Sequence, residues 1–170
     1  AVLKLGSLYI SYSIDVYSGE KKAERHFGIF SLYVSFFPQL VAGPIERSGN
    51  LLPQFFEKHS FNYKDAASGL RQIFWGLFKK VVIADRLAVL VDHVYANPTE
   101  FTGIALTVAA VFFVFQVYCD FSGYSDIAIG AAKVMGFRLT RNFNRPYSSR
   151  SISEYWRRWH ITLTTWFNDY

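Results

Sequence analysis

Near the end of this 170-residue chain, one stretch of sequence contains side chains that could carry out proton transfer. The capping-box pattern Ser151-Ile152-Ser153-Glu154 predicts a helix from about Ile152. On that helix, four polar residues would share one stripe: Arg157, His160, Thr164 and Asn168. Histidine titrates near neutral pH, so His160 would suit acid–base chemistry in an internal cavity. The pattern leaves open the alternative that His160 is a structural histidine at a membrane interface, with its hydrogen bonds satisfied.

An apolar stripe would run beside the polar one on the same predicted helix, about 100° round the axis. It consists of Trp156, Trp159, Leu163, Trp166 and Tyr170. The pattern is typical of a helix anchored by one face, with the polar face turned to a cavity. An aromatic belt at a membrane–water interface would have the same composition.

Two carboxylates are the other candidates for chemistry. Asp120 ends the uncharged run Phe101–Cys119, and Asp126 follows six residues later among small apolar residues. An ionisable group at membrane depth is a functional-site hypothesis by default, although Asp120 would cost little at the head-group level. For Asp126 we favour a structural carboxylate bonded to backbone or arginine. Both are nevertheless kept as substrate-binding candidates.

Long uncharged runs must position these residues. Phe101–Cys119 would form a helix about 28 Å long, close to the thickness of bilayer hydrocarbon, so it predicts a transmembrane helix rather than a buried core helix. Phe27–Ile45 is a second such run, but Pro38 and Pro44 allow a continuous helix only to about Phe37. The broken part is either a cavity-lining break or the exit from the membrane, and the exit is slightly favoured.

Two further segments read as helices. Leu5–Ile14 is typical of the end of an apolar helix. The apolar residues from Leu70 to Val81 recur at helical spacing, which predicts an amphipathic helix that lies at an interface or packs under other helices and continues to Val94. Its polar side would consist of Arg71, Gln72, Lys79 and Lys80. The expected fold class is therefore all-α, a multi-pass integral membrane bundle with broken or re-entrant and interfacial amphipathic helices.

Composition and charge favour some functions and argue against others. The chain is 51% hydrophobic and 18% charged, and its formal net charge of +5 falls within the last 38 residues. A basic segment beside membrane helices favours a position on the cytoplasmic side. It would be a solvated anchor, or a site for anionic lipid head groups or the phosphates of an acyl carrier. Nucleic-acid binding is disfavoured. A single cysteine and four scattered histidines predict neither a disulfide framework nor a metal site. Serine-hydrolase, zinc-hydrolase and dinucleotide motifs do not occur in the sequence.

Both ends of the sequence lie within apolar stretches, so we expect residues 1–170 to be part of a single domain that is truncated at both ends. Four segments in order strongly resemble the membrane-bound O-acyltransferase family, and the likeness runs from about Ser7 to Tyr170. They are Phe37–Ile45, Tyr118–Asp126, Asn142–Tyr147 and Trp156–His160. The branch that they resemble most is that of the bacterial alginate O-acetyltransferases, which also includes teichoic-acid D-alanyl transfer proteins.

The resemblance implies a multi-pass protein of the bacterial cytoplasmic (inner) membrane. It implies transfer of an acyl group from a cytoplasmic thioester toward hydroxyls of an exported polysaccharide. An acetyl group is favoured over D-alanyl. The co-substrate would be acetyl-CoA or an acyl-carrier protein, with no permanently bound cofactor. Membrane lipids and periplasmic acyl-transfer proteins would be its partners, and the polysaccharide its acceptor. A membrane transporter or channel, or a membrane subunit without catalytic activity, remains the alternative.

The resemblance also assigns roles to residues. His160 matches one of two important family histidines and would orient donor or acceptor. The principal histidine lies in a Gly-Leu-Trp-His-Gly type segment, which these 170 residues do not contain, so the piece alone should be inactive. A thioester oxyanion needs fixed hydrogen-bond donors, for which the candidates are Arg157, Trp159 and Asn168.

Overall fold

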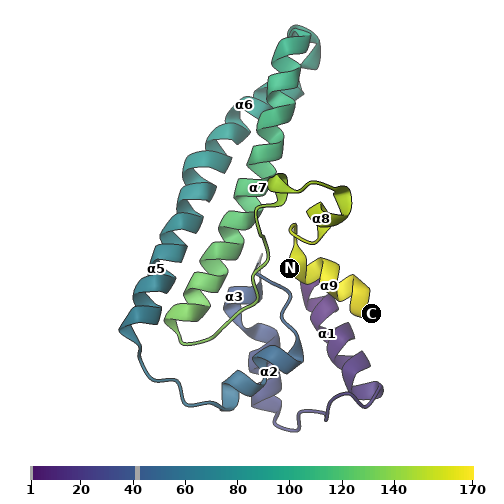
Figure 1. Ribbon diagram of the computed structural model, residues 1–170, viewed down its shortest axis with the longest axis vertical. Helices are drawn as coiled ribbons and strands as arrows, with labels where there is room; N and C mark the ends of the chain where they lie inside the picture. The colour runs from purple at the N-terminus through teal and green to yellow at the C-terminus, as the bar shows by residue number, and fades with distance from the viewer. Residues whose placement is uncertain (1, 41–42) are drawn as a thin grey trace.

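In the computed structural model, which describes residues 2–40 and 43–170, every element of the described chain is helical (Figure 1). The all-α expectation is therefore confirmed for these residues. In chain order the elements are α1 (Val2–Tyr17), α2 (Phe27–Ser35), α3 (Phe37–Leu40), α4 (Ser48–Leu51), η1 (Pro53–Phe56), α5 (Tyr63–Leu77), η2 (Phe78–Ala84), α6 (Asp85–Ala96), η3 (Pro98–Glu100), α7 (Gly103–Val134), η4 (Pro146–Ser148), α8 (Ile152–Trp156) and α9 (Ile161–Asp169).

A tall antiparallel pair dominates the molecule (Figure 1). One arm is α5, the π-helical segment η2 and α6, and the other is α7, which has 32 residues and is therefore about 48 Å long. Of the helices described, α7 alone is long and apolar enough to cross a membrane. Most side chains in its apolar part are exposed on this chain, including Ile104, Val111 and Phe115.

The predicted transmembrane run is therefore helical, but the prediction that Asp120 ends it is wrong. The helix continues through Asp120 and Asp126 to Val134. It can do so because each carboxylate has a cationic partner on the neighbouring arm. Lys80 Nζ lies 2.5 Å from an Asp120 oxygen, and Lys79 Nζ lies 2.5 Å from an Asp126 oxygen. Each pair provides a partner for a charge that would otherwise lie uncompensated beside apolar side chains.

Glycines let the two arms approach closely at two points one heptad apart. A Cβ atom on Gly76 would lie 2.6 Å from the Gly123 carbonyl oxygen, and one on Gly69 would lie 2.7 Å from the Gly130 carbonyl oxygen. No side chain fits between backbones at that separation. The close crossing is what brings residues of the first arm within hydrogen-bond distance of α7.

The helix predicted over Leu70–Val81 is present, within α5 and η2, and continues into α6. Part of its polar side faces the protein, because Lys79 is buried and Gln72 bonds to α7, while Arg71 is exposed. Its apolar residues Leu70 and Phe74 are exposed. Polar groups turned inward and apolar groups turned outward are typical of helices whose surroundings are apolar.

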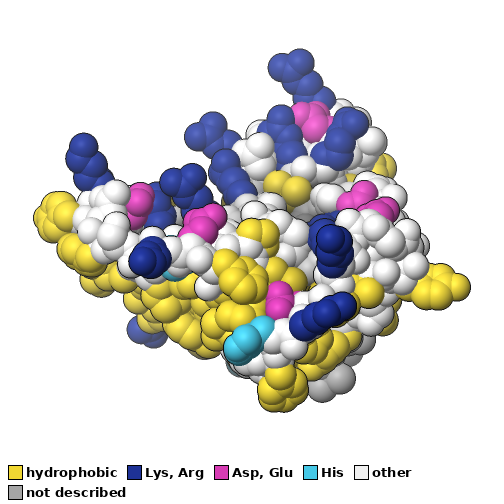
Figure 2. Space-filling model, turned by 90° about the horizontal axis from the view of Figure 1, so that it is seen from below, with side chains coloured by type: hydrophobic (Ala, Val, Ile, Leu, Met, Phe, Trp, Pro, Cys, Tyr) yellow, Lys and Arg dark blue, Asp and Glu magenta, His cyan; other side chains and the backbone are white. Residues whose placement is uncertain are grey.

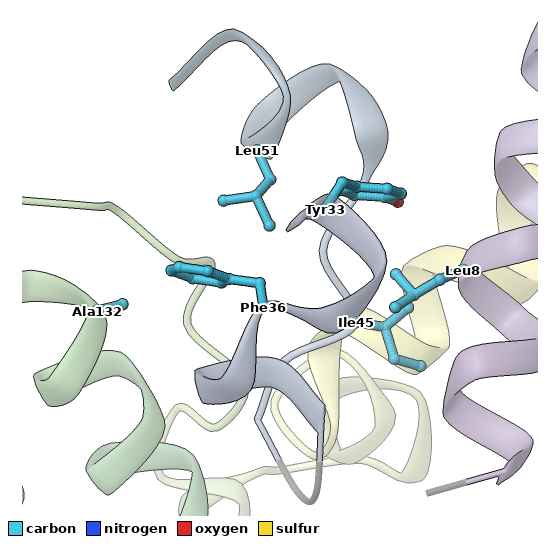
Figure 3. Close-up of a cluster of buried hydrophobic side chains, with 6 residues drawn as sticks. All are labelled: Leu8, Tyr33, Phe36, Ile45, Leu51 and Ala132. Atoms are coloured by element: carbon cyan, nitrogen blue, oxygen red, sulfur yellow. The ribbon is translucent and has the colours of Figure 1, made fainter. Parts of the chain in front are cut away.

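The remaining helices gather beside the lower half of the pair (Figure 1). Their core is a cluster of buried side chains, shown in Figure 3: Leu8, Tyr33, Phe36, Ile45, Leu51 and Ala132. The proline-containing segment predicted as a break does interrupt the helix, since α2 ends at Ser35 and a single helical turn, α3, follows. Pro38 and Pro44 are both buried, so protein covers this segment; Val41 and Ala42 lie outside the described residues.

The molecule is also polarised in charge. Figure 2 views it from below, and lysine and arginine side chains project mostly along one side of this end. Hydrophobic side chains gather mostly on the opposite side.

Candidate active site

Three of the four segments that carry the family resemblance meet at one place. The loop Asn142–Tyr147 lies along the turn between α8 and α9, where the Asn144 amide donates to the Arg158 carbonyl at 2.9 Å. The Ile161 amide donates to the Asn142 carbonyl, also at 2.9 Å. Both segments contact the middle of α7 through ring contacts described below. Two backbone hydrogen bonds, between residues 14 and 19 positions apart in the chain, therefore hold the loop against the turn.

His160 lies at the centre of this junction. It is the residue before α9, with the left-handed backbone angles φ 43° and ψ 53° that are unusual for a side chain other than glycine. Its Nδ1 lies 3.0 Å from Asn142 Oδ1, and its ring meets the Phe121 ring edge to face at 4.7 Å. Backbone strain of this kind persists only where the surroundings fix it, and it concentrates at functional sites.

The left-handed backbone at His160 overturns the continuous helix expected from Ile152. Helix α8 ends at Trp156, a turn follows, and α9 begins at Ile161. The helix start at Ile152 and the Ser151 cap are confirmed, because Ser151 Oγ accepts from the Glu154 amide at 3.1 Å, but the Glu154 carboxylate accepts from the Arg150 amide and not from that of Ser151. The polar and aromatic stripes drawn on one helix are therefore wrong as stripes, because the axis changes between their members.

Asn142 fixes the histidine and is fully buried. Its Oδ1 accepts from Thr162 Oγ1 at 2.9 Å and from the Thr162 amide at 3.3 Å, as well as contacting His160. Its Nδ2 donates to Ser125 Oγ on α7 at 3.4 Å. One side chain thus connects the loop, the start of α9 and the long helix.

Trp159 lies beside the histidine in a cluster of rings rather than in a cavity wall. Its ring meets Phe143 at 5.1 Å and stacks on Tyr155 at 5.7 Å. Tyr147, in the same cluster, donates its hydroxyl proton to the Val114 carbonyl of α7 at 2.9 Å. Burial raises the pKa of Tyr147 to about 12, so this donor keeps its proton at neutral pH. The cluster holds the turn rigidly against α7.

A polar cavity of about 320 Å³ opens next to Asn142. Its charged lining consists of three cations and one carboxylate: Lys79, Arg141, Arg145 and Asp126. Aromatic side chains complete the wall on either side, from Trp75 on α5, Tyr118 on α7 and Phe143 in the loop. The excess of positive charge suits an anionic group, because arginine and lysine make charge-assisted hydrogen bonds to phosphate or carboxylate.

The two predicted carboxylates differ in position. Asp126 lines the cavity, and its partners are Lys79 and Gln72, the latter donating at 2.9 Å, rather than backbone or arginine as expected. Asp120 is not among the cavity-lining residues. It is paired with Lys80, which also lies 2.7 Å from an Asp85 oxygen.

Arg157 and Asn168, predicted as oxyanion donors, are both exposed, on the turn and on α9 respectively. The junction instead brings forward residues that sequence reasoning missed, above all Asn142 and Lys79. Asn142 could have been found from its place in the Asn142–Tyr147 segment of the family resemblance. Lys79 carried no such signal, because its partner Asp126 lies 47 residues away in the chain.

Comparison of the sequence with known proteins identifies its family. Residues 22–170 match the sequence profile of MBOAT, the membrane-bound O-acyltransferase family. The chain is 47% identical over 161 residues to the probable alginate O-acetylase AlgI of Pseudomonas putida, covering 95% of this chain and 33% of that protein. It is 44% identical over 147 residues to the peptidoglycan O-acetyltransferase of Helicobacter pylori, covering 85% and 28%.

A more distant likeness extends to the teichoic acid D-alanyltransferase of Bacillus subtilis, 29% identical over 151 residues, covering 81% of this chain and 35% of that protein. The chain thus spans about a third of the length of the curated relatives it matches. The match covers the loop, the turn and the α7 segment that meet at His160. The chain belongs to the membrane-bound O-acyltransferase family.

Proposed function

We propose that this protein is a membrane-embedded O-acyltransferase that moves an acetyl group from a cytoplasmic thioester toward hydroxyls of an exported polysaccharide. The observation that carries the proposal is His160, held by Asn142 where three family segments meet, beside a cationic cavity. A histidine fixed in this way can orient a hydroxyl or hand on its proton at neutral pH. The acetyl assignment follows the higher identity to relatives named as O-acetylases than to those named as D-alanyltransferases.

In the reaction, an acceptor hydroxyl oxygen bonds to the thioester carbonyl carbon and the carbon–sulfur bond breaks. The hydroxyl proton ends on the leaving thiol. His160 orients the donor or the acceptor in this step. A second histidine, beyond Tyr170, would act as the principal base. The sequence pattern places Arg157 and Asn168 on one helix face as candidates for stabilising the oxyanion. In the structure both are exposed and the helix break separates them, which weakens that assignment.

The cavity beside Asn142 fits the donor. Acetyl-CoA and an acyl-carrier protein both carry a phosphate at the end of the pantetheine arm that is remote from the thioester, and Arg141 and Arg145 supply donors suited to phosphate. Replacing Arg145 with glutamine should raise KM for the donor and change kcat little. The matched control is Arg150→Gln, because Arg150 is exposed in the same region and does not line the cavity.

The setting we propose is a multi-pass bundle in the bacterial cytoplasmic membrane, with lipids on its apolar face and periplasmic partner proteins receiving the acyl group. Support comes from α7, whose apolar face is exposed on this chain, and from Gln72 and Lys79, which turn inward from α5 and η2 to bond with α7. Exposed apolar surface of this extent normally has lipid or protein against it.

The test is incorporation of labelled acetate into exported polysaccharide, comparing cells with the intact gene and cells without it. We expect labelling to depend on the gene. Gene-dependent movement of an unmodified solute with no labelling would favour a transporter. Labelling that depends on the gene but survives loss of every histidine side chain of the protein would favour a non-catalytic membrane subunit.

A further inference from the structure

We infer that Asn142 selects the tautomer of His160, placing the ring proton on Nδ1 and leaving Nε2 as the proton-accepting nitrogen. The assignment of the proton rests on hydrogen-bond chemistry alone. Its consequence for acyl transfer rests on the proposed function. Asn142 is accordingly a positioning residue that acts through the histidine.

The first step is the orientation of the Asn142 amide. The atom at 3.3 Å from the Thr162 backbone nitrogen must be an acceptor, because a backbone N–H can only donate. It is therefore the amide oxygen, Oδ1. Turning the amide over would place an NH₂ group against that N–H, whereas the Thr162 hydroxyl could bond to either end of the amide, so the backbone contact decides the orientation.

The second step is the histidine. Asn142 Oδ1 lies 3.0 Å from His160 Nδ1, and an amide oxygen has no proton to give. Nδ1 must therefore carry the proton. In a neutral imidazole the other nitrogen, Nε2, then holds the basic lone pair.

The third step is what prevents the pair from rearranging. Thr162 Oγ1 accepts from the Ile45 amide at 3.1 Å, which leaves its own proton directed at Asn142. The Asn142 main chain is fixed by the Ile161 amide, and the His160 ring packs edge to face on Phe121 at 4.7 Å. A ring flip would break the Nδ1 contact and disturb this packing. The protein therefore specifies one tautomer before any substrate binds.

The direct test is ¹⁵N NMR of the intact gene product labelled at histidine, reconstituted in lipid. The His160 resonances are identified by their loss in a His160→Gln sample. We expect a protonated Nδ1 and an unprotonated Nε2 at a pH where the ring is neutral. A protonated Nε2 in the wild-type protein overturns the inference, whatever the activity.

Two substitutions separate positioning from packing. Asn142→Ala removes the acceptor, so the neutral ring should populate both tautomers and kcat should fall about 100-fold, the lower end of what positioned acid–base catalysis contributes. Asn142→Asp retains an acceptor for all three donors and should keep Nδ1 protonated and recover part of kcat. A packing role predicts instead that Asn142→Asp, which buries a charge, is at least as damaging as Asn142→Ala.

Asn144→Ala is the matched control, because Asn144 is exposed and its backbone bond to Arg158 survives the change. It should leave the tautomer and kcat unchanged. The amount of each variant in the membrane is measured alongside. The wild-type spectrum decides the inference even if Asn142→Ala fails to fold. A protonated Nδ1 together with full activity of His160→Gln would support the tautomer and contradict the catalytic part of the proposed function.

Discussion

Lys79 connects the two long arms through a buried charge. Its side chain is 9% exposed, and it donates to Ser122 Oγ at 2.9 Å and pairs with Asp126. Gln72 satisfies a second position on the same carboxylate. Because each polar group in this cluster has a partner, the cavity wall can be both charged and rigid.

Replacing Lys79 with methionine should leave Asp126 as a poorly compensated charge. Removing one partner of a buried pair typically costs about 3–5 kcal/mol. The thermal midpoint of the intact gene product in detergent should therefore fall sharply. The double variant Lys79→Met, Asp126→Asn should recover most of the loss, because both members of the ion pair are then replaced by neutral residues. Equal loss in the single and double variants would contradict the pairing argument.

For single residues, the sequence patterns identify some members of the site but not the residues that bond to them. His160 and Trp159 were found, and the structure brings them to one junction with α7. Asp126 was found, but its cationic partner was not, since a pair 47 residues apart leaves no local pattern. Asn142 begins one of the family segments, but its role could not be predicted, because it depends on three segments that meet only in the folded chain.

Among the elements, the crossing of α5 and α7 depends on glycine at both sides. A Cβ atom on Gly76 would lie 2.6 Å from the Gly123 carbonyl oxygen and 2.8 Å from Ile127 Cγ1. Alanine there should destabilise the protein by about 1–3 kcal/mol through overpacking, against the normal preference of helices for alanine. Thermal unfolding of the intact gene product measures this effect.

Gly6 provides the opposite-sign control for that substitution. It lies in helix α1, and nothing lies within 4 Å of a Cβ atom placed on it. Gly6→Ala should therefore stabilise the protein by about 0.5–1 kcal/mol. If both alanine variants shifted stability in the same direction, the close crossing would not be the cause.

The turn between α8 and α9 depends on a carboxylate at the start of α8. The Arg150 amide, which donates to Glu154 at 2.8 Å, holds the pKa of the Glu154 carboxyl below its usual range, and Arg158 assists. A lowered pKa in the folded state means that ionised Glu154 favours folding above its ordinary pKa of about 4.3. That contribution is lost as the pH falls through the lower folded-state value.

Glu154→Gln should therefore be less stable than wild type at pH 6, and the difference should shrink as the pH falls below the ordinary glutamate pKa of about 4.3. Thermal midpoints recorded between pH 3 and pH 7 measure this convergence. Glu20→Gln, at an exposed residue in the loop after α1, serves as the comparison. A constant difference between wild type and Glu154→Gln across the range would contradict the assignment.

Helix positions followed well from hydrophobic periodicity, proline and capping signals, as α2, α5 and α8 illustrate. The ends of two helices did not follow from these signals. Asp120 did not end α7, because lysines on the other arm neutralise the carboxylates that a sequence pattern treats as a stop. The helix from Ile152 ends at Trp156 and a new helix starts after His160, where bonds to Asn142 hold a left-handed backbone that local propensity disfavours.

For the whole molecule, polar clusters join segments from opposite ends of the chain. Buried Asp15 accepts from Ser48 at 3.2 Å and bonds to the Tyr170 hydroxyl, and Arg47 pairs with Asp169. The core of α1 and α2 therefore supports the helix that follows His160. Sequence patterns predicted apolar helices here but not these connections, since a buried carboxylate looks like any other in a sequence.

The apolar face of α7 should behave as a membrane surface. Val111 is 49% exposed on this chain, and arginine near the centre of a spanning helix costs about 2.5–3.5 kcal/mol on insertion scales. Val111→Arg should therefore lower the fraction of protein that resists alkaline extraction from membranes. Asn144→Arg, in the exposed loop, should not. Equal extraction of both would argue against α7 as a spanning helix.

The most direct measurement is acetylation of exported polysaccharide by cells carrying the His160→Ala form of the intact gene, at matched protein level in the membrane. We predict a loss of at least about 100-fold, as expected for a positioned acid–base or orienting group. His93→Ala is the control, because His93 is exposed on α6, where its ring meets the Phe101 ring edge to face, away from the junction around His160. Wild-type acetylation by His160→Ala would contradict the central claim that the junction around His160 is the site of acyl transfer.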